Sequence, residues 1–318
     1  MAQSLEQKLA EIREISSPAA LKPHLRDTNN VVSSAAVTQA VKLNAAELSA
    51  DISALLLSLL KSKDPIKSDK GCRTKVACVK ALAVFDDLYQ NYDLLTVALR
   101  HRQLEPVFGG RDDTGAFLRG ETVQVLGKIN FKDAAMEIAA LLFDECPFPQ
   151  TAAIKTLKHI NNDVAQTSLR LKALADNSTD EVAAELFTAI AQIDPDPIGF
   201  LTSFLYNGSS ATGKTNALFA LGGLKNVEAF NILKDFWGEN TDLGLRKQII
   251  MAISFTRTEE GYDFLKKLLR EGGSVAEYSA QSIGIYLQND KKYAEISTLL
   301  KNIGDKKLID TVSDAIKP

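Results

Sequence analysis

The chain has 318 residues, 45% of them hydrophobic and 24% charged, which is the composition of a folded protein and excludes a disordered, collagenous or membrane chain. Lys and Arg (37) nearly balance Asp and Glu (40), so the net charge of -3 gives no long-range attraction for a polyanion, and nucleic acid is disfavoured as a partner. The three cysteines lack the spacing of a disulfide framework or a zinc site, and they fit the reducing cytoplasm, which is the expected location.

The first predicted element is an amphipathic helix in Met1–Ser16, where Leu5, Leu9 and Ile12 are spaced four and three residues apart. This stretch lacks the apolar region of a signal peptide, and no later stretch has about 18 uninterrupted apolar residues, so neither export nor membrane insertion is expected. Four more helices complete a set of less regular repeats over residues 1–95. They are predicted at residues 19–26, 31–43, 48–61 and 72–89.

Residues 96–120 form a long connection that interrupts the repeat, with a turn predicted at Pro106 and Gly109–Gly110. Insertions in repeat proteins often lie on the binding face, so this segment is the candidate for partner recognition. Phe108 beside paired glycines is a candidate anchor for a partner's groove. In the alternative interpretation, the charged groups pair with one another and brace an irregular repeat, while Phe108 and Phe117 fill the core. The candidate residues are Arg100, His101, Arg102, Glu105, Phe108, Arg111, Asp112, Asp113 and Arg119.

Residues 121–318 repeat with a period of 31–33 residues. The apolar ends of successive helices are Ile129, Ile160, Ile193, Leu224, Phe255 and Tyr286. A second series lies three residues earlier, at Leu126, Leu157, Ile190, Leu221, Ala252 and Ile283. A third series marks the preceding helix of each unit, at Leu201, Leu233, Leu265 and Ile296.

Positions three residues apart share one face of a helix, so each unit is predicted to be two amphipathic helices. One such pair cannot bury its apolar face alone, and neighbouring pairs must stack. The predicted fold is therefore all-α: an α-solenoid of antiparallel helix pairs that forms one elongated domain over residues 1–318.

Units of this length, with a second helix rich in small residues such as Ala217–Gly223, resemble HEAT-like repeats, including the short bacterial repeats of the phycobilisome-lyase HEAT type. The tryptophan, Leu-Gly and tyrosine pattern of tetratricopeptide repeats is missing. The resemblance implies a binding scaffold, and some members of the class handle a bilin chromophore or a damaged DNA base. An aromatic-lined pocket or a basic stripe on the concave face would favour those ligand-handling alternatives.

The segment Gly208–Thr215, GSSATGKT, matches the phosphate-binding pattern GxxxxGK[ST]. A true phosphate loop needs a strand before it and a helix after it. However, Gly213 lies 31 residues before Gly244, which places the motif at the ordinary turn between paired helices. The remaining hypothesis is that Gly213, Lys214 and Thr215 bind a nucleotide, or a phosphate or sulfate ion at the start of a helix without hydrolysis.

The sequence shows no arrangement of residues typical of catalysis. The histidines His24, His101 and His159 are scattered and fall in no metal-binding spacing, so no catalytic residue, metal or cofactor is predicted. The predicted function is a non-catalytic scaffold that binds another protein through the concave face of the solenoid, lined by the second helix of each unit.

Overall fold

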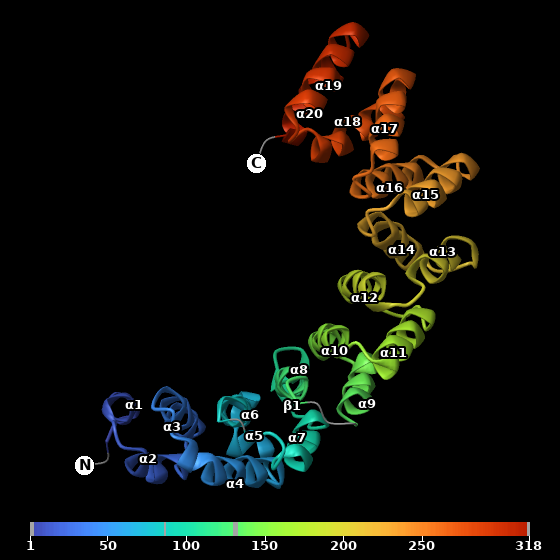
Figure 1. Cartoon of the computed structure of the whole chain (residues 1–318). Helices are drawn as coiled ribbons and strands as arrows, with labels where there is room; N and C mark the ends of the chain where they lie inside the picture. The colour runs from blue at the N-terminus through green and yellow to red at the C-terminus, as the bar shows by residue number, and fades with distance from the viewer. Residues whose placement is uncertain (1–2, 86, 130–132, 317–318) are drawn as a thin grey trace. The chain divides into compact units, whose positions relative to one another are not determined.

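The computed structural model describes residues 3–85, 87–129 and 133–316. The chain divides into two compact units, one ending at Lys172 and the other beginning at Ala173. Within each unit, helices alternate between two layers, and the helices of one layer follow one another side by side (Figure 1). The described part of the chain is thus an all-α stack of helix pairs, as predicted.

In the N-terminal unit, one layer is a row in which each helix packs directly on the next. The row consists of α1 (Leu5–Glu14), α3 (Asn30–Lys42), α6 (Arg73–Val84), α8 (Gly115–Leu126) and α10 (Pro147–Ile160). The other layer holds α2 (Pro18–Leu25), α4 (Ser49–Leu60), α7 (Tyr92–Leu99) and α9 (Ala134–Ala139). Short turns complete the unit: η1 (Ala46–Leu48), α5 (Pro65–Ser68), η2 (Lys70–Cys72) and η3 (Ala140–Phe143). Helix α11 (Asp163–Leu174) follows.

The C-terminal unit repeats the arrangement more regularly. One layer is the row α12 (Asp180–Ile193), α14 (Ala211–Gly223), α16 (Leu243–Phe255), α18 (Gly273–Ser282) with its extension η4 (Ile283–Tyr286), and α20 (Lys306–Ile316). The other layer consists of α13 (Pro197–Tyr206), α15 (Val227–Glu239), α17 (Glu259–Glu271) and α19 (Asp290–Ile303).

The predicted apolar series coincide with the core. All members of the second series and of the third are at most 1% exposed. The first series lies nearer the helix ends, where Ile160, Ile193, Leu224 and Phe255 are only half-buried. Because burial recurs at the predicted positions, the interval found in the sequence is the structural repeat.

Helix starts in the C-terminal unit are fixed by side chains that accept a hydrogen bond from a backbone N–H of the first turn. Asp196, Asn226 and Thr258 do this for α13, α15 and α17. Ser210 and Asp242 do the same for α14 and α16. Polar capping residues between apolar series therefore define the boundaries of the pairs.

Glycines allow close contact between successive helices of the row. A Cβ on Gly222 would lie 2.3 Å from the carbonyl oxygen of Ala252, and one on Gly284 would lie 2.5 Å from that of Ala315. In the N-terminal unit, a Cβ on Gly127 would lie 2.3 Å from a methyl group of Thr156. Each of these glycines directly follows a member of the second apolar series, so the same repeat position provides the close approach.

Some expected boundaries were wrong. The helix predicted at residues 72–89 begins after Cys72, which has a left-handed backbone (φ 52°), and ends at Val84. The helix expected in Met1–Ser16 is shorter, and Met1 and Ala2 lie outside the described residues. Among the helices that the structure describes, none has the length and apolar character needed to cross a membrane.

Candidate functional site

The connection predicted at residues 96–120 is shorter in the structure: it spans residues 100–114, between the end of α7 and the start of α8, and contains a β-hairpin. Strands β1 (Leu104–Val107) and β2 (Gly110–Asp113) pair antiparallel, with Val107 opposite Gly110. Gly109 has φ 85°, a conformation that favours glycine, and it closes the turn after Phe108. The Phe108 side chain is fully exposed at the tip, and Leu104 and Val107 are each 51% exposed. The hairpin therefore presents apolar side chains to solvent.

Arg119, in α8, is only 1% exposed, and it connects the base of the hairpin to Asp144 in the next helix pair. Its guanidinium donates two hydrogen bonds to Asp144, both of 2.7 Å, and one to Asp113 at 2.9 Å. It also donates to the carbonyl oxygen of His101 at 2.9 Å. Asp113 in turn accepts hydrogen bonds from the backbone of Gln103 and Gly115. This cluster holds both ends of the hairpin together.

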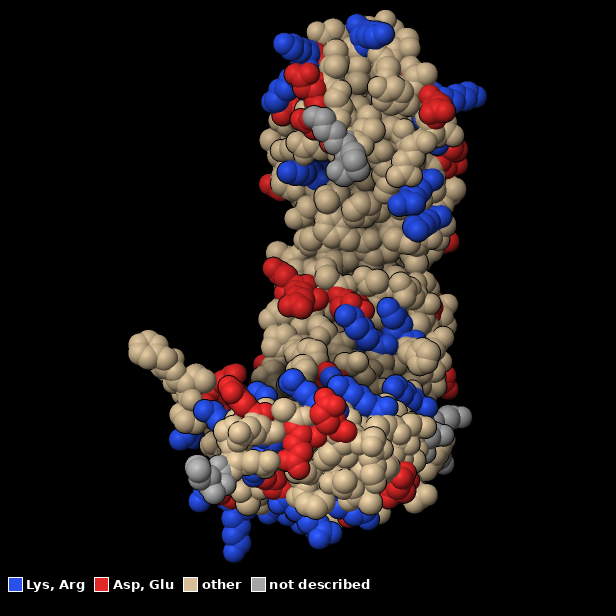
Figure 2. All heavy atoms as spheres, turned by 90° about the vertical axis from the view of Figure 1, so that its left-hand side faces the viewer, with Lys and Arg blue, Asp and Glu red and all other residues tan. Residues whose placement is uncertain are grey.

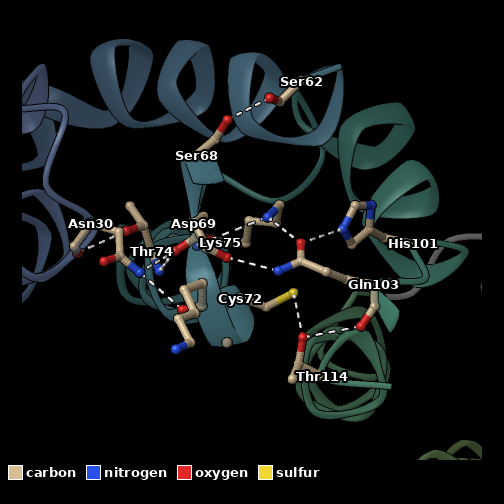
Figure 3. A network of polar contacts seen from close by, with 12 residues as sticks. Asn30, Ser62, Ser68, Asp69, Cys72, Thr74, Lys75, His101, Gln103 and Thr114 are labelled. Atoms are coloured by element: carbon tan, nitrogen blue, oxygen red, sulfur yellow. Dashed lines mark hydrogen bonds and ion pairs between the residues drawn. The ribbon is translucent and has the colours of Figure 1, made fainter. Parts of the chain in front are cut away.

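A second buried cluster lies beneath β1. Lys75 and Asp69 are fully buried and 3.4 Å apart, and Gln103 accepts from Lys75 at 3.0 Å (Figure 3). Gln103 also donates to the backbone oxygen of Asp69 and to Glu105, both at 2.8 Å. Asp69 accepts from the backbone N–H groups of Thr74 and Lys75. The polar groups under the hairpin thus hydrogen-bond to one another across three segments of the chain.

Glu105 joins this second cluster to the hairpin. Its carboxylate accepts from the Gly71 N–H at 2.6 Å and from the Thr114 hydroxyl at 2.8 Å. Burial alone would raise the pKa of Glu105, but these bonds and the one from Gln103 outweigh it and lower the pKa below 4.5. Burial alone would also raise the pKa of Asp113. The backbone hydrogen bonds from Gln103 and Gly115 and the positive charge of Arg119 outweigh it, and together they lower the pKa below 3.8. Both carboxylates are therefore held in the charged form.

His101 precedes the hairpin and is partly buried. Burial lowers its pKa below 6.5 because it disfavours the charged imidazolium, against the opposing effect of a hydrogen bond with Gln103. Its role here is structural: the ring contacts Gln103, and its backbone oxygen accepts from Arg119.

The other predicted recognition residues lie around the same segment. Arg100 pairs with Glu137, and Arg102 contacts Asp113 and Glu145 while remaining 45% exposed. Arg111 and Asp112 are exposed on β2. The nine candidates therefore divide into a buried support (Glu105, Asp113 and Arg119), a partly buried His101, and solvent-facing side chains (Arg100, Arg102, Phe108, Arg111 and Asp112).

An aromatic pair beside the hairpin was missed in the sequence. Phe117, in the first turn of α8, stacks on Phe148 of α10 with ring centroids 5.3 Å apart, and the Lys80 ammonium lies 5.6 Å from the Phe117 centroid. Phe117 is 48% exposed and Phe148 39% exposed. A Cβ on Gly120 would lie 2.3 Å from the Phe148 ring, so glycine makes room for it. The expectation that Phe108 and Phe117 fill the core was wrong, because both face solvent.

The phosphate-loop-like motif covers the end of the turn after α13, at residues 208–210, and the start of α14. Residues 200–206, just before the motif, belong to α13, so a helix stands where a phosphate loop needs a strand, and Gly213, Lys214 and Thr215 lie in the first turns of α14. The Asp176 carboxylate accepts from the backbone N–H of Ser210 at 2.6 Å and from its hydroxyl at 2.7 Å. Thr215 donates to Gln248 at 3.0 Å. The Asp176 carboxylate therefore already occupies hydrogen-bond donors of this turn that an anion would use.

Among the described side chains, no group of three or more His, Cys, Asp or Glu residues is placed to hold a metal ion. The three cysteines are unbridged; Cys72 and Cys78 are buried and Cys146 is partly buried. Burial raises the pKa of the Cys72 thiol to about 11. None of these groups forms an assembled reactive centre.

No family model matches the chain, and no curated protein matches it. Among solved structures, human deoxyhypusine hydroxylase in complex with glycerol aligns with a TM-score of 0.33 and 16% identity, over 86% of this chain and 98% of that one. An engineered protein aligns with a TM-score of 0.38 and 15% identity, over 94% of this chain and 81% of that one. Similarities at this level carry no information on activity.

Proposed function

We propose that this chain is a HEAT-like solenoid that works in the cytoplasm as a non-catalytic scaffold and binds another protein. The single observation that supports this most strongly is Phe108, whose side chain is fully exposed at the tip of the hairpin. An aromatic side chain held in water is unfavourable for the isolated chain, and buried aromatic anchors are frequent at the centres of protein interfaces.

The support beneath the hairpin strengthens the proposal. Arg119, Asp144 and Asp113 form a buried ionic cluster, and Glu105 links β1 to the segment at Gly71. A hairpin that is held in one conformation loses less conformational entropy on binding than a mobile loop does. We infer that the base is rigid so that the tip can enter an apolar pocket of the partner.

The adjoining surface extends the contact. Phe117 and Phe148 stack beside the start of α8, and the Lys80 ammonium, which also pairs with Glu121, lies over the Phe117 ring. An apolar centre with a charged rim is the usual anatomy of a protein interface. The proposed interface therefore comprises the hairpin tip and this aromatic pair.

The test is affinity capture of the tagged protein from its native lysate, with Phe108→Ser as the variant and Tyr293→Ser as the control. Tyr293 is 49% exposed and lies in the other unit, so the control removes a comparable exposed ring. We expect one protein recovered in stoichiometric amount with wild type and control, and lost with Phe108→Ser. Equal recovery with all three would refute the role of the hairpin.

A further inference from the structure

A second surface lies in the same unit but on different helices. A groove of about 380 Å³ follows α3, bounded by α1 and by the first residue of α6. Leu9, Val31 and Ala35 contribute apolar lining. Arg13, Lys42 and Arg73 also line it, and no carboxylate is among the described residues that do so.

The three cations stand at opposite ends of this groove. The Thr74 hydroxyl donates to the carbonyl oxygen of Asn30 at 3.0 Å, which places Arg73 beside the start of α3. The Gln39 amide donates to the carbonyl oxygen of Arg13 at 3.2 Å, which places Arg13 near the end of α3, where Lys42 lies. From Val31 to Lys42 the helix rises roughly 16 Å. The groove is therefore lined by apolar and uncharged polar side chains along its length and has basic residues at both ends.

Some cations of this unit pair with carboxylates, and others form no ion pair with a described residue. Lys8, Lys22 and Lys80 pair with Asp27, Asp51 and Glu121. Within the described residues, Arg13, Lys42 and Arg73 form no ion pair. Figure 2 shows Lys and Arg side chains, with Asp and Glu side chains close by, along the upper edge of the lower part of that view.

We propose that this groove binds an acidic segment of a partner protein. Carboxylates about 16 Å apart would meet Arg73 at one end and Arg13 with Lys42 at the other, while apolar side chains between them contact Leu9, Val31 and Ala35. This rests on the proposed scaffold function but uses a surface separate from the hairpin.

Two features favour a peptide over a nucleic acid. Double-stranded DNA carries a charge about every 1.7 Å of its axis and is held by rows of cations, whereas this groove has cations only at its ends. Its uncharged middle, where Val31 and Ala35 alternate with Ser34 and Thr38, suits side chains rather than a phosphate backbone.

The experiment is a selection from a displayed library of random peptides about 16 residues long with the full-length chain as bait, followed by affinity measurement on the enriched peptides. We expect enrichment of peptides with Asp or Glu at both ends of an apolar stretch. The double variant Lys42→Glu/Arg73→Glu should weaken their binding at least about tenfold.

The control is Lys61→Glu/Lys63→Glu, which makes the same change of charge at exposed positions outside the groove and should leave the affinity unchanged. Circular dichroism of both variants checks that the helices are intact. Enrichment of peptides without acidic residues, or of none, would overturn the proposal. So would tighter binding of a duplex DNA oligonucleotide that is lost in the groove variant.

The two proposals fail separately. Phe108→Ser should leave binding of the selected peptides unchanged, because Phe108 does not line the groove. If Phe108→Ser loses the captured protein but binds the selected peptides normally, the hairpin alone is responsible for the captured protein. If the groove variant loses the peptides but still captures the protein, the groove alone is responsible for peptide binding.

Discussion

Replacing Arg119 with methionine is the most direct test of the support beneath the hairpin. The substitution keeps a long apolar stem but removes the guanidinium that donates to Asp144 and Asp113. Both carboxylates are less than 10% exposed in their side chains, so water cannot replace the lost donor freely. Removing one partner of a buried ion pair typically costs about 3–5 kcal/mol. We expect a loss of stability near the lower end, because Asp144 keeps the Cys146 N–H and Asp113 keeps two backbone donors.

Urea unfolding followed by circular dichroism measures the loss, and hydrogen exchange of residues 99–126 locates it. The double variant Arg119→Met/Asp144→Leu is the matched comparison, since it removes both the charge and its main partner. It should be more stable than Arg119→Met alone, because buried ion pairs can often be replaced by apolar groups with little loss. A single-variant loss below about 1 kcal/mol, or unchanged exchange at the hairpin, would refute the idea that this cluster holds the site.

Three further outcomes are expected. Leu221→Asp places a carboxylate at a fully buried position of α14 and should lower the stability of the C-terminal unit by several kcal/mol. Urea unfolding followed by the fluorescence of Trp237, which lies in the same unit, measures this loss. An unfolding midpoint equal to that of the wild type would contradict the repeat assignment. Acid should destabilise the hairpin, because below about pH 6.5 the unfolded chain protonates His101 more readily than the folded one, and below about pH 4.5 it protonates Glu105 and then Asp113 more readily. The protection factors of the amides at residues 101–115, which correct for the pH dependence of intrinsic hydrogen exchange, should therefore fall as the pH falls. Protection factors that stayed constant would argue against these groups. Gly120→Ala should displace the Phe148 ring and lower the thermal midpoint, and an unchanged midpoint would show that the ring moves at no cost.

The sequence predicted the repeat well because its signal is carried by many positions at once. Leu126, Leu221 and Leu265 each fall on a series with a common period, and burial of such series is what stacked helix pairs require. The same reasoning failed at Cys72, where a left-handed residue starts the helix, since no period or capping residue marks such a position.

The hairpin could not be found from its sequence in the same way. Its strands are only four residues each, and its turn is Phe108–Gly109 rather than the Asn-Gly or Asp-Gly that typifies tight hairpins. The charged composition indicated a functional or bracing segment, but the division into buried support and exposed tip depends on tertiary partners. Asp69, Lys75 and Asp144 come from outside the segment, and nothing in the local sequence links them to it.

The spacing of helices in the C-terminal unit differs between its two layers. At Gly222 and Gly284 the backbones of successive helices in one layer nearly touch, while in the other layer aromatic rings such as Phe230 and Phe264 separate α15 from α17, with centroids 6.2 Å apart. A pair that carries this glycine is thus a wedge, narrower on the glycine side than on the ring side. Stacked wedges bend toward the narrow side, so Gly222 and Gly284 favour local bending, and enlarging either glycine would push two successive helices apart and straighten that part of the stack.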